Sequence, residues 1–450
     1  MNQLLFANLT TKKIHLSALA VTATTLAFGV FGAIPAQAQT PPPAGASSSL
    51  PSVSQPTGGE VKTITVSGGN RTLFKLAVAP LVGERDTSNT VVEVASRDFT
   101  LSSIFQVLDP KSFTANLSAE GTGIEPASWR NIGAEGVVKG LSSMRGSNVH
   151  LELRLFVVSR GTEAVLKKDY DVPPTGVRGA VHQFCNEVVK WFTGTAGSFG
   201  TRMVFSATTG RGQKGIFTID SDGAGLSRLS TVSNVALAPA VGPGGVYYSA
   251  GMPDGTYQLF KVGSSSPVVK NPGLIFGVGF GGGKMALVVS QNGQSDIFTG
   301  GPDGSGLSKS TQGGLNTHPA IGPGGQLAYV SNQGGNPQIY VDGKRVSWRG
   351  TYNMAPVWCN DPEGVRILFM GRDGATWDIF SVDPSGSPGS MKRLTQDQGS
   401  NTYPACSPDG RQVAFFSTRG GGGIYLSNPQ GMNQQRISTA SGESLRWEGN

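Results

Sequence analysis

The sequence predicts a small α/β domain followed by a six-bladed β-propeller. Two observations carry this prediction. The chain is rich in turn formers, with 65 Gly and 27 Pro among 450 residues, against the ~7% Gly of a typical globular protein. Helical spacing of apolar residues vanishes after residue 200, where a strand-and-turn unit recurs with a period near ~40 residues. A helix bundle is excluded, because each Gly costs about 1 kcal/mol relative to Ala inside a helix.

The N-terminus has the three parts of a secretory signal peptide. Lys12 and Lys13 precede an uncharged apolar run, Ile14 to Ala33, and Ala36-Gln37-Ala38 supplies small residues for cleavage. We therefore expect residues 1–38 to be a signal peptide, with an uncleaved membrane anchor as the alternative. No later run of ~18 uncharged apolar residues occurs, so the mature chain is not expected to span a membrane.

Charge and cysteine content set further bounds. Lys and Arg number 36 and Asp and Glu 29, a net charge of +7, which gives little support for nucleic-acid binding. The three cysteines are too few for a disulfide scaffold. Cys359 and Cys406 occupy comparable places in successive repeats, so they form either a disulfide or a pair of buried thiols. Buried thiols are the simpler expectation.

Two regions lie between the signal and the repeats. Residues 39–59 are rich in Pro, Ser and Gly and are typical of a flexible tether. Residues 60–200 alternate between strand and helix patterns and predict the α/β domain. The expected strands are 60–66, 74–80, 136–140, 149–158 and 164–172, and the expected helices are 89–105 and 177–192.

Residues 201–450 carry the propeller repeats. His318-Pro-Ala-Ile-Gly-Pro-Gly-Gly325 and Tyr403-Pro-Ala-Cys-Ser-Pro-Asp-Gly410 are two of the copies. The position of the first Pro recurs at 239, 277, 319, 356, 404 and 445. The last copy, Glu443–Glu448, is an isolated strand, and the first unit, at Met203–Ala207, lacks that same strand. We therefore expect the C-terminal strand to complete the first blade and close the ring.

No motif predicts catalysis, a cofactor or a metal. Gly277–Gly282 matches G-x-G-x-x-G, but it occupies a propeller turn and not a strand-to-helix junction. No two of His15, His150, His182 and His318 are placed as metal ligands, and a nucleophile elbow is absent. A propeller enzyme and a carbohydrate-binding propeller remain alternatives. The repeated aromatics, such as Phe217 and Tyr340, lie within strands and indicate core packing.

The segments that enter the first strand of a blade are the best candidates for a protein interface. They carry Tyr, Asn and His side chains, which suit protein recognition. The candidate residues at this propeller mouth are Asn316, Thr317, His318, Tyr352, Asn353, Asn401, Thr402 and Tyr403.

The chain resembles the TolB family of periplasmic propeller proteins. The resemblance rests on Trp129-Arg-Asn-Ile-Gly-Ala-Glu-Gly-Val-Val-Lys-Gly140, on Phe192-Thr-Gly194 and on Ser407-Pro-Asp-Gly410, in the family's order. It implies a monomeric, non-enzymatic adaptor of the Tol-Pal envelope system, which maintains outer-membrane integrity and assists constriction at cell division.

The resemblance also implies two partners. A Pal-like peptidoglycan-associated lipoprotein would bind the propeller mouth. A TolA-like inner-membrane protein would bind the N-terminal strand once it is released. That switch strand would comprise Glu60, Val61, Lys62, Thr63, Ile64, Thr65 and Val66. The tether before this strand and the replacement of Ser-Pro-Asp-Gly by Gly-Pro-Gly-Gly in two repeats depart from the family pattern.

Overall fold

The structure is a computed structural model that describes residues 72–230, 235–269 and 273–449. The predicted signal peptide, tether and switch strand lie outside these residues. Among the described residues, no helix has the length and apolar character needed to cross a membrane.

The α/β domain is built on one six-stranded sheet. The strand order is β3-β1-β4-β5-β6, and β2 pairs with β4. Its strands are β1 Phe74–Val78, β2 Val82–Gly83, β3 Phe105–Val107, β4 Gly136–Arg145, β5 Asn148–Val157 and β6 Ala164–Val172. Its helices are α1 Arg85–Leu101, α2 Leu117–Glu120, α3 Pro126–Asn131 and α4 Val177–Thr193, with 3-10 turns η1 Pro110–Ser112, η2 Val158–Arg160 and η3 Pro174–Gly176.

Helices α1 and α4 supply the apolar residues that cover this sheet. Phe99 of α1 and Phe184 of α4 are fully buried in one core with Leu76 of β1. The expected helix at 89–105 begins four residues earlier and ends at Leu101. Its first turn is polar, so the apolar spacing did not reveal the start. Helix α4 ends at Thr193 and is followed by Gly194, whose φ of 83° fits the left-handed turn that commonly stops a helix.

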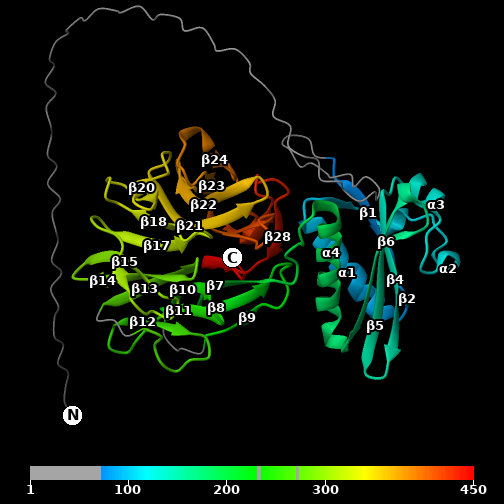
Figure 1. Cartoon of the computed structure of the whole chain (residues 1–450), viewed down its shortest axis with the longest axis horizontal. Coiled ribbons are helices and arrows are strands. Elements are labelled where there is room, and N and C mark those ends of the chain that lie inside the picture. The colour runs from blue at the N-terminus through cyan, green and yellow to red at the C-terminus, as the bar shows by residue number, and fades with distance from the viewer. Residues whose placement is uncertain (1–71, 231–234, 270–272, 450) are drawn as a thin grey trace, which may run out of the picture. The chain divides into compact units, whose positions relative to one another are not determined.

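Six sheets follow as the propeller blades (Figure 1). The strands of the first blade are β29 Glu443–Trp447, β7 Arg202–Gly210, β8 Gln213–Asp220 and β9 Ser227–Arg228. The second and third blades are β10 Ala236–Gly242, β11 Gly245–Gly251 and β12 Tyr257–Lys261, then β13 Leu274–Gly281, β14 Lys284–Gln291, β15 Gln294–Gly300 and β16 Ser308–Lys309. The fourth blade is β17 Asn316–Ile321, β18 Leu327–Ser331, β19 Gln338–Val341 and β20 Lys344–Arg345.

The fifth and sixth blades complete the ring. They are β21 Tyr352–Asp361, β22 Gly364–Arg372, β23 Trp377–Val382 and β24 Lys392–Arg393, then β25 Asn401–Cys406, β26 Val413–Ser417, β27 Gly423–Ser427 and β28 Gln435–Ser438. The 3-10 turns are η4 Pro388–Ser390 and η5 Arg419–Gly421. Strand β29 pairs with β7, with Trp447 opposite Met203. The predicted closure of the first blade by the C-terminal strand is confirmed.

Aromatic pairs fill the blades between the second and third strands. Tyr329 lies opposite Tyr340 in the β18–β19 register, and their rings stack with centroids 5.8 Å apart. Phe369 and Phe380 repeat the arrangement at 5.6 Å. The repeated aromatic residues therefore pack in the core, as predicted, and do not form a platform for a sugar.

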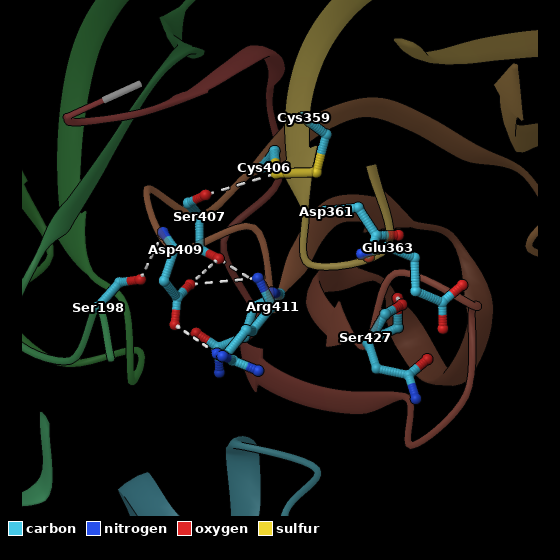
Figure 2. Close-up of a disulfide and its surroundings, with 11 residues drawn as sticks. Ser198, Cys359, Asp361, Glu363, Cys406, Ser407, Asp409, Arg411 and Ser427 are labelled. Carbon is cyan, nitrogen blue, oxygen red and sulfur yellow. Dashed lines mark hydrogen bonds and ion pairs between the residues drawn. A yellow bond between two sulfur atoms is a disulfide. The ribbon is translucent and has the colours of Figure 1, made fainter. Parts of the chain in front are cut away.

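A disulfide joins the inner strands of the fifth and sixth blades. Cys359 of β21 and Cys406 of β25 are bonded, with their Cα atoms 5.4 Å apart (Figure 2). The simpler expectation of two buried thiols is wrong, because the two strands run side by side where the cysteines face each other. Cys185 is a buried free cysteine of α4.

Candidate partner-binding site

The inner strands of the blades share a bulge near their first residues. In β17 the pairing register shifts between Thr317 and Ala320, and in β25 it shifts between Thr402 and Ala405. The residue before the repeated Pro position has a positive φ in five blades. These residues are Ala238, His318, Ala355, Tyr403 and Ser444, with φ of 48°, 50°, 51°, 51° and 55°. Because the geometry repeats, it belongs to the blade architecture, and it redirects the side chains at the bulge.

The three predicted Asn residues are buried and hold the loops that precede the inner strands. Asn401 is fully buried, and its Nδ2 donates to Asp378 Oδ1 at 3.3 Å. The same carboxylate oxygen accepts from the Thr395 hydroxyl at 2.7 Å, and that hydroxyl accepts from the Ile379 backbone N–H. Asn401 is therefore one member of a network that ties the fifth blade to the sixth.

The network recurs at two other blade junctions. Between the third and fourth blades, Asn316 Nδ2 of β17 donates to Asp296 Oδ1 of β15 at 3.2 Å, and the Thr311 hydroxyl donates to the same oxygen. Between the fourth and fifth blades, Asn353 Nδ2 of β21 donates to Gln338 Oε1 of β19 at 2.7 Å. Buried polar groups require such partners. Side chains engaged in this way position the mouth and do not lie on its surface.

The remaining predicted residues are more accessible. Thr317, His318, Thr402 and Tyr403 are half-buried, and Tyr352 is 40% exposed. The Tyr352 ring meets the Trp377 ring edge-on, with centroids 5.8 Å apart.

Two exposed apolar residues beside these loops escaped the sequence analysis. Phe276 of β13 is 38% exposed and packs against the Tyr257 ring at 4.9 Å. Leu315, 46% exposed, immediately precedes Asn316. The sequence signal that could have identified them was their place in the repeat, at or just before the start of an inner strand. Together with Tyr352 they form what we call the apolar rim of the propeller mouth.

Arg446 is the charged side chain nearest the channel side of the mouth among the described residues that line the cavity of the central channel. Burial lowers the pKa of His318 to about 4, and the Arg446 charge adds to that lowering. Blade four lies opposite blade one in a ring of six, so Arg446 acts on His318 across the channel. Burial raises the pKa of Tyr403. Both His318 and Tyr403 are therefore neutral near pH 7.

The opposite end of the sixth blade contacts the α/β domain. The Asp409 backbone N–H donates to Ser198 Oγ at 3.1 Å (Figure 2). Arg411 Nη2 donates to Thr195 Oγ1 at 2.8 Å, and Gln412 Nε2 donates to the Leu101 carbonyl at 3.1 Å. This end of the sixth blade is thus occupied by the chain itself.

A buried charged cluster lies where α1 and α4 meet the first blade. His182 Nδ1 lies 2.7 Å from Asp98 Oδ2, and Arg178 Nη2 lies 2.5 Å from Asp222 Oδ2. Ligand atoms of Asp98, His182 and Asp222 all lie within 4.8 Å of one another, a spacing that could hold a metal ion. The Arg178 guanidinium already supplies a positive charge to Asp222, so the arrangement serves as an ion-pair junction between the domains.

The pKa shifts in this cluster follow its burial. Burial raises the pKa of Asp98. Burial would also raise the pKa of Asp222, but hydrogen bonds from the Ala224 backbone and Arg178 outweigh it and lower that pKa. Burial, together with the Asp98 charge, raises the pKa of the Cys185 thiol well above its usual range. Cys185 is therefore a protonated, unreactive core residue.

Two family models match the chain. The TolB amino-terminal domain matches residues 62–164, and the TolB beta propeller domain matches residues 189–388. The first match covers strands β1–β5, and the second begins in α4 and reaches the fifth blade. The chain belongs to the TolB family.

Curated relatives carry the same family name. A Tol-Pal system protein TolB of Anaeromyxobacter dehalogenans is 32% identical over 274 residues, which is 58% of this chain and 61% of the relative. A TolB homolog of Chlorobium luteolum is 28% identical over 330 residues, 70% of this chain and 74% of the relative. The chain thus spans a little under two thirds of the first relative's length.

A solved TolB structure has the same fold. The crystal structure of TolB from Acinetobacter baumannii superposes with a TM-score of 0.72 over 84% of this chain and 97% of that protein. Sequence identity is 20%, so this similarity shows the fold alone.

Proposed function

We propose that this chain is the TolB component of a Tol-Pal system and works in the periplasm as a protein–protein adaptor. Its family membership and the name shared by its relatives, Tol-Pal system protein TolB, support this proposal. The Cys359–Cys406 disulfide fits an oxidising compartment outside the cytoplasm. In this role the chain would link a Pal-like lipoprotein to Tol proteins of the inner membrane and assist envelope integrity and division.

The propeller mouth is the proposed surface for the Pal-like partner. The observation that carries this assignment is the contrast between the two ends of the blades. The mouth presents the apolar rim Phe276, Leu315 and Tyr352, while Asp409 and Arg411 at the other end are bonded to the α/β domain. Exposed aromatic and aliphatic side chains next to half-buried polar ones are typical of the core of an interface.

An adaptor needs no catalytic machinery, and the side chains that line the central channel are consistent with that role. Among the described residues whose side chains line its cavity of about 270 Å³, Arg446 is the single ionisable one. A general acid and general base therefore do not face each other across that cavity.

The binding of a Pal-like lipoprotein's soluble domain to the mature chain tests the mouth assignment. Tyr352→Ala should weaken binding at least tenfold, or about 1.4 kcal/mol. Met432→Ala is the matched control, because Met432 is similarly exposed, at 44%, but lies in the loop between β27 and β28, outside the mouth. Undiminished binding by Tyr352→Ala, or an equal loss with both variants, would contradict the assignment.

The switch strand is proposed to bind the TolA-like partner. Deletion of residues 60–66 from the mature chain should abolish binding of a TolA-like periplasmic domain and leave the Pal-like domain bound. Replacing residues 39–59 by a Gly/Ser segment of equal length is the control, since a tether acts through its length and flexibility. Retained TolA-like binding after the 60–66 deletion would reject the strand.

A further inference from the structure

The central channel contains a ring of residues two positions beyond the bulge, one from each inner strand. Five members of the ring are small and apolar, and the sixth is an arginine. They are Ala240, Val278, Ala320, Val357, Ala405 and Arg446, and all six line one cavity of about 270 Å³. The other five blades hold a small side chain at this position, so the arginine departs from the pattern of the ring.

The guanidinium of Arg446 has no acidic partner. Its one hydrogen bond goes from Nη1 to its own strand, at the Leu445 carbonyl, 2.8 Å away. Within residues 72–230, 235–269 and 273–449, no carboxylate forms an ion pair with it. The nearest acid along its strand, Glu443, is paired with Lys214 Nζ at 2.6 Å. Four of the five donors of the guanidinium fork remain for a guest.

Much of the cavity wall near Arg446 is apolar, with Asn360 as a polar member. Burial lowers the pKa of Arg446 to about 10, and it stays charged at neutral pH. The cavity wall includes Phe280, Trp358 and Trp447, and it extends to the turn residues Pro323 and Gly449. Arg446 is half-buried. A partly desolvated charge without a partner carries a cost, and an anion placed beside it would offset that cost.

We propose that this cavity is a binding site for one carboxylate carried on a compact apolar body, with Arg446 as the anion-binding residue. The arginine fork matches the two oxygens of a carboxylate. The cavity is just below the ~300–1,000 Å³ of drug-sized pockets, so the guest is a small acid or one acidic side chain. A single positive charge balances a carboxylate but not a phosphate, which carries about −1.5 to −2 at pH 7.

Titration of the mature chain with 4-methylpentanoate tests the site. Calorimetry would measure affinity, and tryptophan fluorescence would report on Trp358 and Trp447 in the cavity wall. The acid should bind, and the neutral amide 4-methylpentanamide and inorganic phosphate should each bind at least tenfold more weakly. Absence of heat and of a fluorescence change with the acid, or equal binding of acid and amide, would overturn the proposal.

Variants assign the effect to Arg446. Arg446→Gln should weaken binding of the acid at least tenfold, and Arg446→Met, which continues the apolar ring, provides a second variant if the first folds poorly. Arg211→Gln is the matched control, because Arg211 is exposed in the turn between β7 and β8 and should bind the acid as the unmodified chain does. Unchanged affinity in either Arg446 variant would refute the site.

A third experiment distinguishes the two possible sources of the carboxylate, a protein partner and a free acid. If a protein partner supplies it, Arg446→Gln should also weaken binding of the Pal-like soluble domain at least tenfold, and saturating 4-methylpentanoate should compete with that domain. If a free acid supplies it, neither treatment should affect the domain. Because the first arm uses this chain alone, the site and the proposed partnership can fail separately.

Discussion

The turns that end the inner strands are of two kinds, polar turns and glycine turns. The kind of turn matches the group that packs against it. In the sixth blade the turn Ser407–Gly410 is built from side chains. The Ser407 hydroxyl lies 2.5 Å from Asp409 Oδ1 and accepts from the Gln412 N–H at 2.9 Å. The turn is then bonded to Ser198 of the α/β domain. Its polar residues are retained where they hold a second domain.

The glycine turns make room for aromatic residues of the next blade. In the fourth blade the turn Gly322–Gly325 keeps the same backbone hydrogen bond, from the Gly325 N–H to the Gly322 carbonyl at 2.9 Å. A Cβ added at Gly322 would lie 2.8 Å from the Trp358 ring, and one at Gly242 would lie 2.6 Å from Phe280. Some of the chain's glycines are therefore needed because aromatic rings that line the channel cavity pack directly against their backbone.

Removal of the Cys359–Cys406 disulfide, beside the polar turn Ser407–Gly410, should destabilise the chain most. Cys359 and Cys406 are 47 residues apart in sequence, so Cys359→Ser with Cys406→Ser should lower the free energy of unfolding by about 4 kcal/mol in the chain-entropy account. Urea denaturation measures it. Reduction of the unmodified chain should give a similar loss. An unchanged denaturation midpoint would show that the link contributes nothing.

Acid should lower the free energy of unfolding through protonation of His318, at the mouth end of β17. The pKa of His318 is about 4 in the folded chain and ~6.5 when unfolded. The unfolded chain binds the extra proton first, so this contribution is complete above pH 6.5 and is lost as pH falls to about 4. The loss should reach up to about 3 kcal/mol.

The variant His318→Asn isolates this contribution. Asn tolerates the positive φ of 50° at this position and does not titrate. Comparison of chemical denaturation for the two chains at pH 7 and pH 4.5 cancels the other titrating groups. The same pH dependence in both chains would mean that His318 is not the group responsible.

A side chain added to a glycine turn should cost an intermediate amount. Gly322→Ser forces a Cβ against Trp358 and should destabilise the chain by roughly 1–3 kcal/mol. Gly324→Ser is the control, because its Cβ would meet only the movable amide end of Gln326, and thermal unfolding should scarcely change. If the two variants unfold at the same temperature, the glycine at 322 is not there to admit the tryptophan.

Removal of the carboxylate from the polar turn should have the smallest effect. Asp409→Gly deletes the contacts to the Ser407 hydroxyl and the Arg411 N–H and should cost about 1 kcal/mol. Faster hydrogen exchange at residues 195–198 would locate the loss at the domain contact. Asp303→Gly changes a similar but exposed turn and should leave those residues unaffected; equal exchange in both variants would show that the turn does not hold the domain.

Local patterns predicted the repeated elements of this fold well. The Pro position near Pro319 and Pro404 and the orphan strand at Glu443 were enough to predict six blades and their closure. Short-range spacing also located α4 to within one residue at its C-terminal end. These predictions were correct because the repeat period and the turn residues are properties of residues close together in the sequence.

Features that depend on distant residues were harder to predict. Asn401 has the composition of an exposed loop residue, and only its partner Asp378, 23 residues earlier, buries it. The Cys359–Cys406 pairing depended on the approach of two inner strands. Arg446 was hidden because its significance lies in the five Ala and Val residues around it, on five other strands.

Hydrogen exchange of the mature chain with and without a Pal-like soluble domain tests the central claim most directly, namely that the propeller mouth binds the partner while the opposite turns hold the α/β domain. We predict slower exchange at residues 313–318, 350–354 and 399–403 on binding, with no change at 195–201 and 407–412. Protection confined to 407–412, with none at the mouth, would contradict the account.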